Sequence, residues 1–309
     1  MIIYPTSIAK NCSVIKRFLC CTVSAFFLLP VFAQDSLKVP QVSTPLIDTA
    51  PTNFSIAHTK TNHPVYKIKP GVDIPVMAVG AGWSLYAFTE IYSKEHSTEE
   101  QILALDKNDI NWFDRWAVRP FSESIDKASY YPFFASMTLP LLFLTGEETR
   151  KDFFKLTFLY LEAMSVTGLL YTGSVYFIDR YRPYAYSSES TIEQRTRGGA
   201  KNSFYAGHVA LVATSTFFMA KVYADYHPES RSKWVFYSLA GATTGVTAYL
   251  RYRAGQHFPT DLLLGMAQGT LTGLLVPALH KSKIMKNEKL SILPYSTGKA
   301  HGLSFVYKL

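Results

Sequence analysis

Cysteine is scarce in this sequence, and all of it lies near the start. The 309 residues include only three cysteines, Cys12, Cys20 and Cys21. From residue 22 onward the chain therefore has no disulfide, no thiolate metal site and no cysteine nucleophile. Enzyme classes that depend on those groups are excluded for this part of the chain.

Residues 1–33 predict a secretory signal peptide. Three cations precede an apolar run over residues 18–32, and Ala33 is a small residue suited to cleavage. An uncleaved anchor helix is the alternative that this short run leaves open. Removal of the segment takes away three of the 31 Lys and Arg residues and no acids, which lowers the net charge from +8 to +5.

Charge is also sparse, at 17% of residues against 48% hydrophobic. No basic cluster is interleaved with stacking aromatic residues, so nothing indicates nucleic-acid binding. Residues at metal-ligand spacing are absent too, and the sequence predicts neither a metal nor a cofactor. The modest positive excess suits a protein that faces anionic lipid head groups.

Long apolar segments take the place of charge. Five of them cover roughly residues 131–146, 153–178, 207–225, 232–250 and 262–280. The last four approach or reach the length that crosses a bilayer. The sequence thus predicts an all-α fold, a transmembrane bundle of five or six helices. Alternating apolar residues appear only at the end, where residues 303–309 suggest a short strand.

The remaining segments complete the predicted organisation. Residues 34–72 read as a flexible linker or arm, and residues 283–309 as a C-terminal tail around the 131–282 core. Between them, residues 73–130 hold a weakly apolar segment and a connector. Trp112, Phe113 and Trp116 predict an amphipathic helix at the membrane surface within that connector, with a packed connector as the alternative.

Three polar stretches stand where apolar helices are expected to end. They are Asp179–Tyr184, Asn202–His208 and Arg251–Asp261. Each places arginine or histidine where a hydrophobic helix meets water, so three helix ends could converge on one anion.

The third stretch has the residues of a reactive histidine. Phe258-Pro259 marks a helix start, because proline suits the first helical position. Asp261 then falls in the first turn, from which its carboxylate could hold one ring nitrogen of His257 and leave the other free. Arg251 adds a forked cation suited to a phosphate or carboxylate.

In their order, Arg-Pro, Gly-His and Arg-x5-His-x3-Asp, the motifs resemble the type 2 phosphatidic acid phosphatase family, whose superfamily also holds the vanadium haloperoxidases. The resemblance covers roughly residues 110–280. It implies a metal-independent phosphatase in which His257 forms a phosphohistidine, His208 is the acid and Asp261 orients His257. Arg182, Gly207 and Arg251 would bind the phosphate.

Three positions depart from the family pattern. Val175 stands where a lysine is usual, and Ala206 and Leu250 stand where serines are usual. A lost oxyanion donor costs about 3 kcal/mol in the transition state, so other donors would be needed. The nearby candidates are Arg180, Arg197, Lys201 and Arg253. A further polar residue, Glu162, lies within an apolar run and is expected to be a structural hydrogen-bond partner.

Loop charge predicts the orientation. Cations follow the 131–146 segment, precede the 232–250 segment and follow the last one, and these three groups share one face of an alternating bundle. By the positive-inside tendency that face is cytoplasmic, so the motifs face the periplasm of a bacterial inner membrane. This holds if residues 73–92 do not cross.

The sequence therefore predicts a membrane enzyme that hydrolyses a lipid phosphate or pyrophosphate. One alternative is a degenerate member that binds lipid phosphate without turnover, which the replaced positions would explain. Another is vanadate-dependent halide oxidation, against which the bilayer-length segments argue. The identity of the lipid and the oligomeric state are left open.

Overall fold

The computed structural model describes residues 64–282, 290–296 and 301–307. The fold below is that of the unit Lys60–Leu309. The predicted signal peptide and most of the predicted linker lie outside the described residues.

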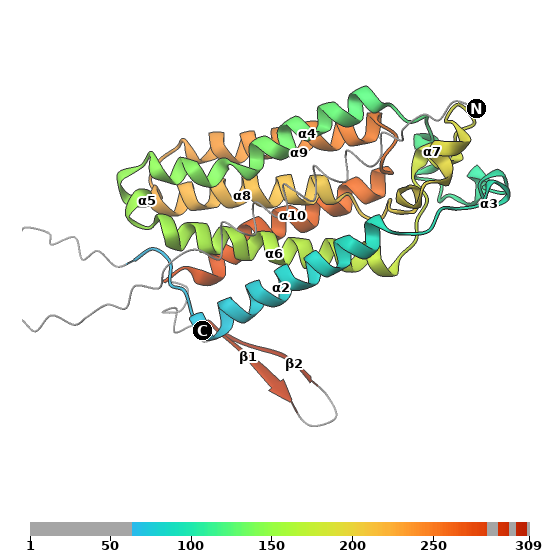
Figure 1. Cartoon of the computed structure of the whole chain (residues 1–309). Helices are drawn as coiled ribbons and strands as arrows, with labels where there is room; N and C mark the ends of the chain where they lie inside the picture. Colours follow the sequence, from blue (N-terminus) through green and yellow to red (C-terminus); the bar gives the residue numbers. More distant parts are fainter. Residues whose placement is uncertain (1–63, 283–289, 297–300, 308–309) are drawn as a thin grey trace, which may run out of the picture. The chain divides into compact units, whose positions relative to one another are not determined.

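Within the described residues, six long helices form a bundle, in which they lie side by side (Figure 1). They are α2 (Pro70–Tyr92), α4 (Glu123–Met137), α6 (Phe153–Phe177), α8 (Gly207–Tyr226), α9 (Lys233–Arg253) and α10 (Pro259–His280). Helix α8 is central and contacts α4, α6, α9 and α10, while α2 packs against α6.

Short elements cover the two ends of the bundle. One end holds the short helices α3 (Glu99–Leu103) and α7 (Ile192–Thr196), and the other holds α5 (Glu147–Lys151). Four 3-10 helices also belong to the loops of the first end: η1 (Lys107–Asp109), η2 (Arg115–Ala117), η4 (Pro183–Tyr186) and η5 (Gly198–Lys201). We call the end where α8 and α10 begin the site end, and the end where α10 finishes the far end.

A row of glycines on α10 lets it approach α8 closely. A Cβ on Gly265 would lie 2.7 Å from the carbonyl oxygen of Ala206, and one on Gly273 would lie 2.6 Å from that of Thr214. Gly269 between them has no room for a Cβ beside Ala210. Small residues at such spacing are the usual means of bringing membrane helices together. This packing sets the first turn of α10 beside the start of α8.

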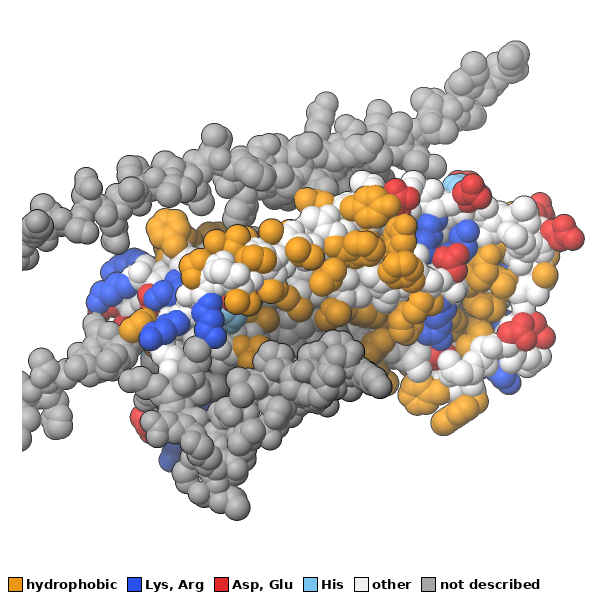
Figure 2. Space-filling view, turned by 90° about the horizontal axis from the view of Figure 1, so that it is seen from below, with side chains coloured by type: hydrophobic (Ala, Val, Ile, Leu, Met, Phe, Trp, Pro, Cys, Tyr) orange, Lys and Arg blue, Asp and Glu red, His pale blue; other side chains and the backbone are white. Residues whose placement is uncertain are grey.

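The outside of the bundle is apolar between two charged ends. Figure 2 shows a hydrophobic surface over its middle, with cations at the far end and mixed charges at the site end. Large apolar side chains such as Val79, Leu170, Val246 and Leu271 are exposed. Among the described residues, three helices are long and apolar enough to cross a membrane: α2, α6 and α10. This surface is that of a membrane protein.

The structure refines the predicted segments. Residues 131–146 form the end of α4 and a 3-10 helix, η3 (Leu139–Leu144), rather than one span. Residues 73–92, predicted to form only a weakly apolar segment, lie in the 23-residue helix α2. The count of five or six membrane helices stays a prediction, since α8 and α9 have the length but not the apolarity of the other three.

The predicted amphipathic helix at the aromatic residues is not formed. Residues 111–119 contain only turns and the short η2, because the buried Asp114 turns its side chain toward Asn111 and Thr260. Trp112 and Trp116 are exposed. The alternative, a packed connector, describes this segment better.

The fold is mostly helical rather than all-α. Strands β1 (Leu290–Ser296) and β2 (His301–Tyr307) pair antiparallel, with Leu290 opposite Tyr307. The predicted C-terminal strand corresponds to β2. Its partner was missed, because the β1 sequence contains a proline and lacks a clear alternation.

Candidate active site

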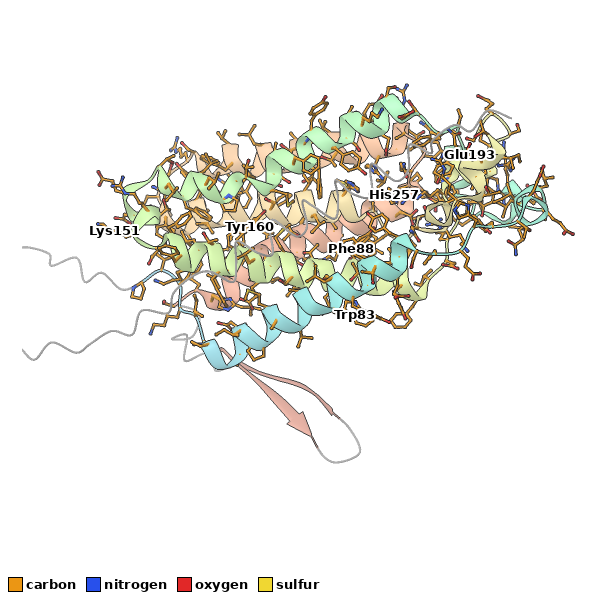
Figure 3. All side chains as sticks on the ribbon, viewed as in Figure 1. Trp83, Phe88, Lys151, Tyr160, Glu193 and His257 are labelled. Carbon is orange, nitrogen blue, oxygen red and sulfur yellow. The ribbon has the colours of Figure 1, made fainter. Side chains whose placement is uncertain are left out.

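All the motif residues lie at the site end. Arg182 precedes η4, Gly207 and His208 open α8, Arg251 lies in the last turn of α9, and His257 follows in the loop before α10. Asp261 falls in the first turn of α10, as the sequence predicts. Figure 3 shows His257 at this end, far from Lys151 at the other.

The loop between α9 and α10 turns sharply at Gly255. Its φ of +73° lies in the left-handed region, and a Cβ there would lie 2.8 Å from the carbonyl oxygen of Pro120. Both features require glycine. The turn brings Gln256 and His257 back toward the bundle before Pro259 starts α10.

His257 is held as a neutral imidazole with one free nitrogen. Its side chain is buried, and Nδ1 lies 2.7 Å from the carbonyl oxygen of Ser203. A carbonyl only accepts, so Nδ1 carries the proton and Nε2 keeps its lone pair. Burial lowers the pKa of His257 well below its usual value, and the positive charges of Arg182 and Arg251 lower it further. This is the state that a nucleophile needs.

Among the described residues no hydrogen bond joins Asp261 to His257, contrary to the predicted arrangement. Its Oδ2 accepts hydrogen bonds from Ser203 Oγ at 2.6 Å and from the Phe258 backbone N–H at 3.1 Å. Its Oδ1 pairs with Arg180. A carboxylate in the first turn of a helix is engaged by the free N–H groups there. Asp261 therefore fixes Ser203, and the Ser203 backbone in turn holds His257.

Arg180 bridges two buried carboxylates. It pairs with Asp261 and, at 2.7 Å, with Asp114 Oδ2, and neither carboxylate is exposed. Burial would raise the pKa of Asp114, but hydrogen bonds from Thr260, Asn111 and Arg180 hold it below the usual range. Arg180 thus ties the connector to α10, and its guanidinium is not free for a phosphate. Asp114 was missed in the sequence, where it stood only among exposed aromatics.

Arg182 and Arg251 are joined through two side chains that the motifs do not include. Arg182 Nη1 donates to the Gln256 side chain, whose Nε2 donates to Asp126 Oδ1 at 2.9 Å. Arg251 Nη1 donates to the same oxygen at 2.6 Å and to Ser129 Oγ at 3.1 Å. Arg251 Nε is buried and has no hydrogen-bond partner among the described residues. This N–H is available to an anion.

His208 stands against aromatic side chains of α4. Its ring centroid lies 4.8 Å from those of both Tyr130 and Phe133. Beside it, the ring of Tyr171 from α6 covers Gly207 and leaves no room there for a Cβ. Neither tyrosine belongs to a motif, and their distant places in the sequence gave no signal.

The guanidiniums of Arg182 and Arg251 influence the histidines and tyrosines of the site electrostatically. Arg182 and Arg251 both interact electrostatically with Tyr130 and Tyr171, and also with the two imidazoles, His208 and His257. The motifs therefore bring together two cations and two imidazoles, and α4 and α6 add one phenol each. Such an arrangement can bind a tetrahedral anion and act on it with acid, base or nucleophile.

Two other residues predicted to donate to the phosphate, Arg253 and Lys201, form no hydrogen bond or ion pair with these groups among the residues that the structure describes. Arg253 is exposed and donates to Tyr249 Oη at 2.8 Å on the outer face of α9. The carbonyl of Lys201 accepts from the Arg180 backbone at 2.9 Å, and within the described part of the chain its side chain makes no hydrogen bond or ion pair with the motif residues. Val175, at the position where the family has lysine, packs against Ala87 and Ile91 of α2.

Comparison with known proteins supports the resemblance. Residues 156–285, which include all the motif residues, match the family model of the PAP2 superfamily. A crystal structure of the first transmembrane PAP2-type phosphatidylglycerolphosphate phosphatase from Bacillus subtilis covers 70% of this chain and 98% of its own, with 18% sequence identity and a TM-score of 0.39. No curated protein matches the sequence. The resemblance to the type 2 phosphatidic acid phosphatase superfamily is thus confirmed over residues 156–285.

Proposed function

We propose that this protein hydrolyses a phosphate or pyrophosphate group of a membrane lipid through a phosphohistidine at His257. One observation carries the proposal: a buried, neutral His257 whose Nδ1 is bound to Ser203 and whose Nε2 is free, beside Arg182 and Arg251. The match to the PAP2 superfamily supports the reaction class.

The proposed reaction has two steps. His257 Nε2 attacks phosphorus, and the bond to the leaving oxygen breaks as His208, protonated once the phosphate anion is bound, donates its proton to that oxygen. A water molecule then attacks the phosphohistidine with His208 as base, which releases phosphate and restores both imidazoles. Arg182 and Arg251 offset the charge of the equatorial oxygens in each step.

Arg251 Nε and two phenols from outside the motifs replace the donors that are missing. We assign this role to Arg251 Nε, which has no partner among the described residues, and to the hydroxyls of Tyr130 and Tyr171. Both phenols lie within electrostatic reach of Arg182 and Arg251. A phenol is a weaker donor than an ammonium, but in a dry site its hydrogen bond to a phosphate is charge-assisted.

The apolar surface of the bundle supports a lipid substrate. The exposed apolar side chains would place the site end near the head groups, while acyl chains stay in the hydrocarbon. A water-soluble phosphate ester would have no use for that position. Phosphatidic acid, phosphatidylglycerophosphate, isoprenyl pyrophosphate and phosphorylated lipid A share the required chemistry.

The proposed orientation puts the site end in the periplasm of a bacterial inner membrane. Cations of the far end support it: Arg150, Lys151, Arg231, Lys233 and Lys281. Because α2 runs between the two ends and is long enough to cross, residues 64–69 would then be cytoplasmic. A cleaved signal peptide would place them in the periplasm. If α2 crosses the membrane, a periplasmic site end and a cleaved signal peptide cannot both be correct.

The test is phosphate release by the purified full-length chain in detergent, against a panel of the four lipid classes. We expect turnover of at least one lipid, lost by three orders of magnitude or more in His257→Ala, in line with losses on the order of 10³-fold or more for removed nucleophiles. His227→Ala, at an exposed histidine of the far end, is the matched control. Binding of these lipids without turnover would contradict the proposal and favour the degenerate alternative.

A further inference from the structure

A second cluster of titratable side chains lies at the far end of the bundle. Asp73 comes from the first turn of α2, Glu162 from α6, and His280 from the last residue of α10. All three are buried, with 3%, 5% and 9% of their surface exposed. One ligand atom from each lies within 4.8 Å of the others. We call these three residues the far-end cluster.

The hydrogen bond of His280 fixes which nitrogen faces the carboxylates. Nδ1 lies 2.7 Å from the carbonyl oxygen of Val276, one turn earlier in α10, so Nδ1 carries a proton. The other ring nitrogen, Nε2, faces the two carboxylates. It lies 3.2 Å from Asp73 Oδ2 and 3.5 Å from Glu162 Oε2. In a neutral imidazole this nitrogen holds a lone pair. Three electron-rich atoms therefore face one another.

Protein groups satisfy this cluster only in part. Asp73 Oδ2 accepts from the Lys69 backbone N–H at 2.5 Å, but Glu162 Oε2 is buried with no hydrogen-bond partner among the described residues. No lysine or arginine pairs with either carboxylate in the described chain. Lys281, the residue after His280, pairs with Asp225 instead, as does Lys221.

A single added proton would leave the charge unbalanced, and neutrality by protonation needs a further one, on Glu162. If His280 took a second proton, one positive charge would face two buried carboxylates, and a net negative charge would remain in an apolar bundle. Buried charges without full compensation are strongly unfavourable. A divalent cation bound by two carboxylates and a neutral histidine would bring the sum to zero.

The distances also suit a metal ion. Four ligands at 2.0–2.2 Å around Zn²⁺ lie about 3.4 Å apart in a tetrahedron. The two measured separations, 3.2 and 3.5 Å, bracket that value. The backbone carbonyl of Val276 also accepts a hydrogen bond from His280 Nδ1–H. Metal-bound histidines are usually oriented in this way, by a hydrogen bond from the ring nitrogen that does not bind the metal. Three protein ligands would leave the fourth position for water.

We propose that the far-end cluster binds a divalent transition-metal ion, with Zn²⁺ as the probe, and that the ion ties α2 to α6 and α10. Sequence spacing gave no sign of it, because the ligands lie on three helices and are separated by 89 and 118 positions. The cluster is at the opposite end from His257. Its role is therefore structural, and the proposal does not depend on the proposed hydrolysis.

The first measurement needs no substitution. The full-length protein is purified in detergent without added metal, and its metal content is determined by plasma mass spectrometry before and after treatment with a chelator. We expect close to one bound ion per chain, a Tm lower by several degrees after chelation, and recovery of that Tm on adding Zn²⁺. The proposal would be overturned if the protein contained no metal and its Tm changed neither with the chelator nor with added Zn²⁺.

Substitutions then locate the ion. Glu162→Gln and His280→Gln should each lose the metal and the Zn²⁺ response of the Tm, whereas His227→Gln should keep both. His227 is a suitable control because it is exposed and lies at the same end, stacked on Tyr223. Equal loss in the control, or metal retained in both cluster variants, would show that Zn²⁺ binds elsewhere and would overturn the assignment.

Discussion

The Nδ1 atom of His257 lies 2.7 Å from the carbonyl oxygen of Ser203. The proposed nucleophile is thus oriented by the loop that leads into α8, and not by the carboxylate four residues after it. Asp261 acts one step further away, through the 2.6 Å hydrogen bond that it accepts from the Ser203 hydroxyl. This division between the two residues can be tested.

The backbone carbonyl of Ser203 holds His257 directly, so its hydroxyl should matter less than the charge of Asp261, which also holds Arg180 and the Phe258 backbone N–H. Ser203→Ala keeps the carbonyl that holds His257, so we expect a loss of about 1 kcal/mol in unfolding free energy, the value of one hydrogen bond, and phosphate release within tenfold of wild type. Asp261→Asn leaves Arg180 facing a neutral group, which should cost about 3 kcal/mol and abolish most activity. Chemical unfolding in detergent and steady-state kinetics measure both. Equal effects of the two substitutions would contradict the arrangement.

The lowered pKa of His257 predicts a loss of stability in acid. The folded protein binds fewer protons at His257 than the unfolded chain does once the pH falls below the unfolded pKa of about 6.5. Stability from this residue is therefore complete above pH 6.5 and declines as the pH falls toward the folded pKa. His257→Asn should flatten the fall in unfolding free energy between pH 7.5 and 5.5, and His227→Asn should leave it unchanged. A slope identical in all three proteins would show that His257 is not held neutral.

The two tyrosines beside the arginines should act as phosphate donors. We expect Tyr130→Phe and Tyr171→Phe each to lower kcat by about 10- to 100-fold, the effect of a charge-assisted hydrogen bond, while Tm changes little. Tyr131→Phe is the matched control, because Tyr131 is the next residue in α4 and is 79% exposed. Unchanged kcat in both variants would remove the phenols from the site.

The close packing of α8 and α10 predicts opposite effects for two glycine substitutions. Gly269→Ala forces a methyl group into the Ala210 backbone, and we expect overpacking to cost about 1–3 kcal/mol. Gly245 on α9 has open space around it, so Gly245→Ala should be neutral or stabilise by up to about 1 kcal/mol from helix propensity. Unfolding of both variants in detergent decides this. Phosphate release should fall only in Gly269→Ala, which shifts Asp261 relative to His208.

The proposed orientation predicts which end a membrane-impermeant maleimide can reach in intact cells. In a background with Cys12, Cys20 and Cys21 replaced by serine, Glu193→Cys at the site end should be labelled from the periplasm. Lys151→Cys at the far end should be labelled only after the cells are opened. Both positions are exposed, and Figure 3 shows them at opposite ends. The reverse pattern would place the site in the cytoplasm.

Much of the fold was readable from local patterns. The apolar segments at 153–178 and 262–280 correspond to α6 and α10, and Pro259 starts its helix as expected. The sequence underestimates how well residues 73–92 form a long apolar helix, because the two internal glycines lower the apparent apolarity. In the structure Gly80 makes room for the α6 backbone at Ser165. Such a contact has no counterpart in a local pattern.

The sequence by itself determined which polar residues stand at the ends of the apolar helices. It placed His208, His257, Arg182 and Arg251 at the boundaries of apolar runs, and hydrophobicity alone requires those boundaries to lie at the surface of a bundle. Which groups satisfy one another was decided only by the tertiary structure: Ser203 rather than Asp261 holds His257, Asp114 shares Arg180, and Asp73, Glu162 and His280 meet from three helices. The reason is physical. A hydrogen bond or an ion pair depends on a few ångströms between atoms, and the distance between residues far apart in the chain is set by helix packing.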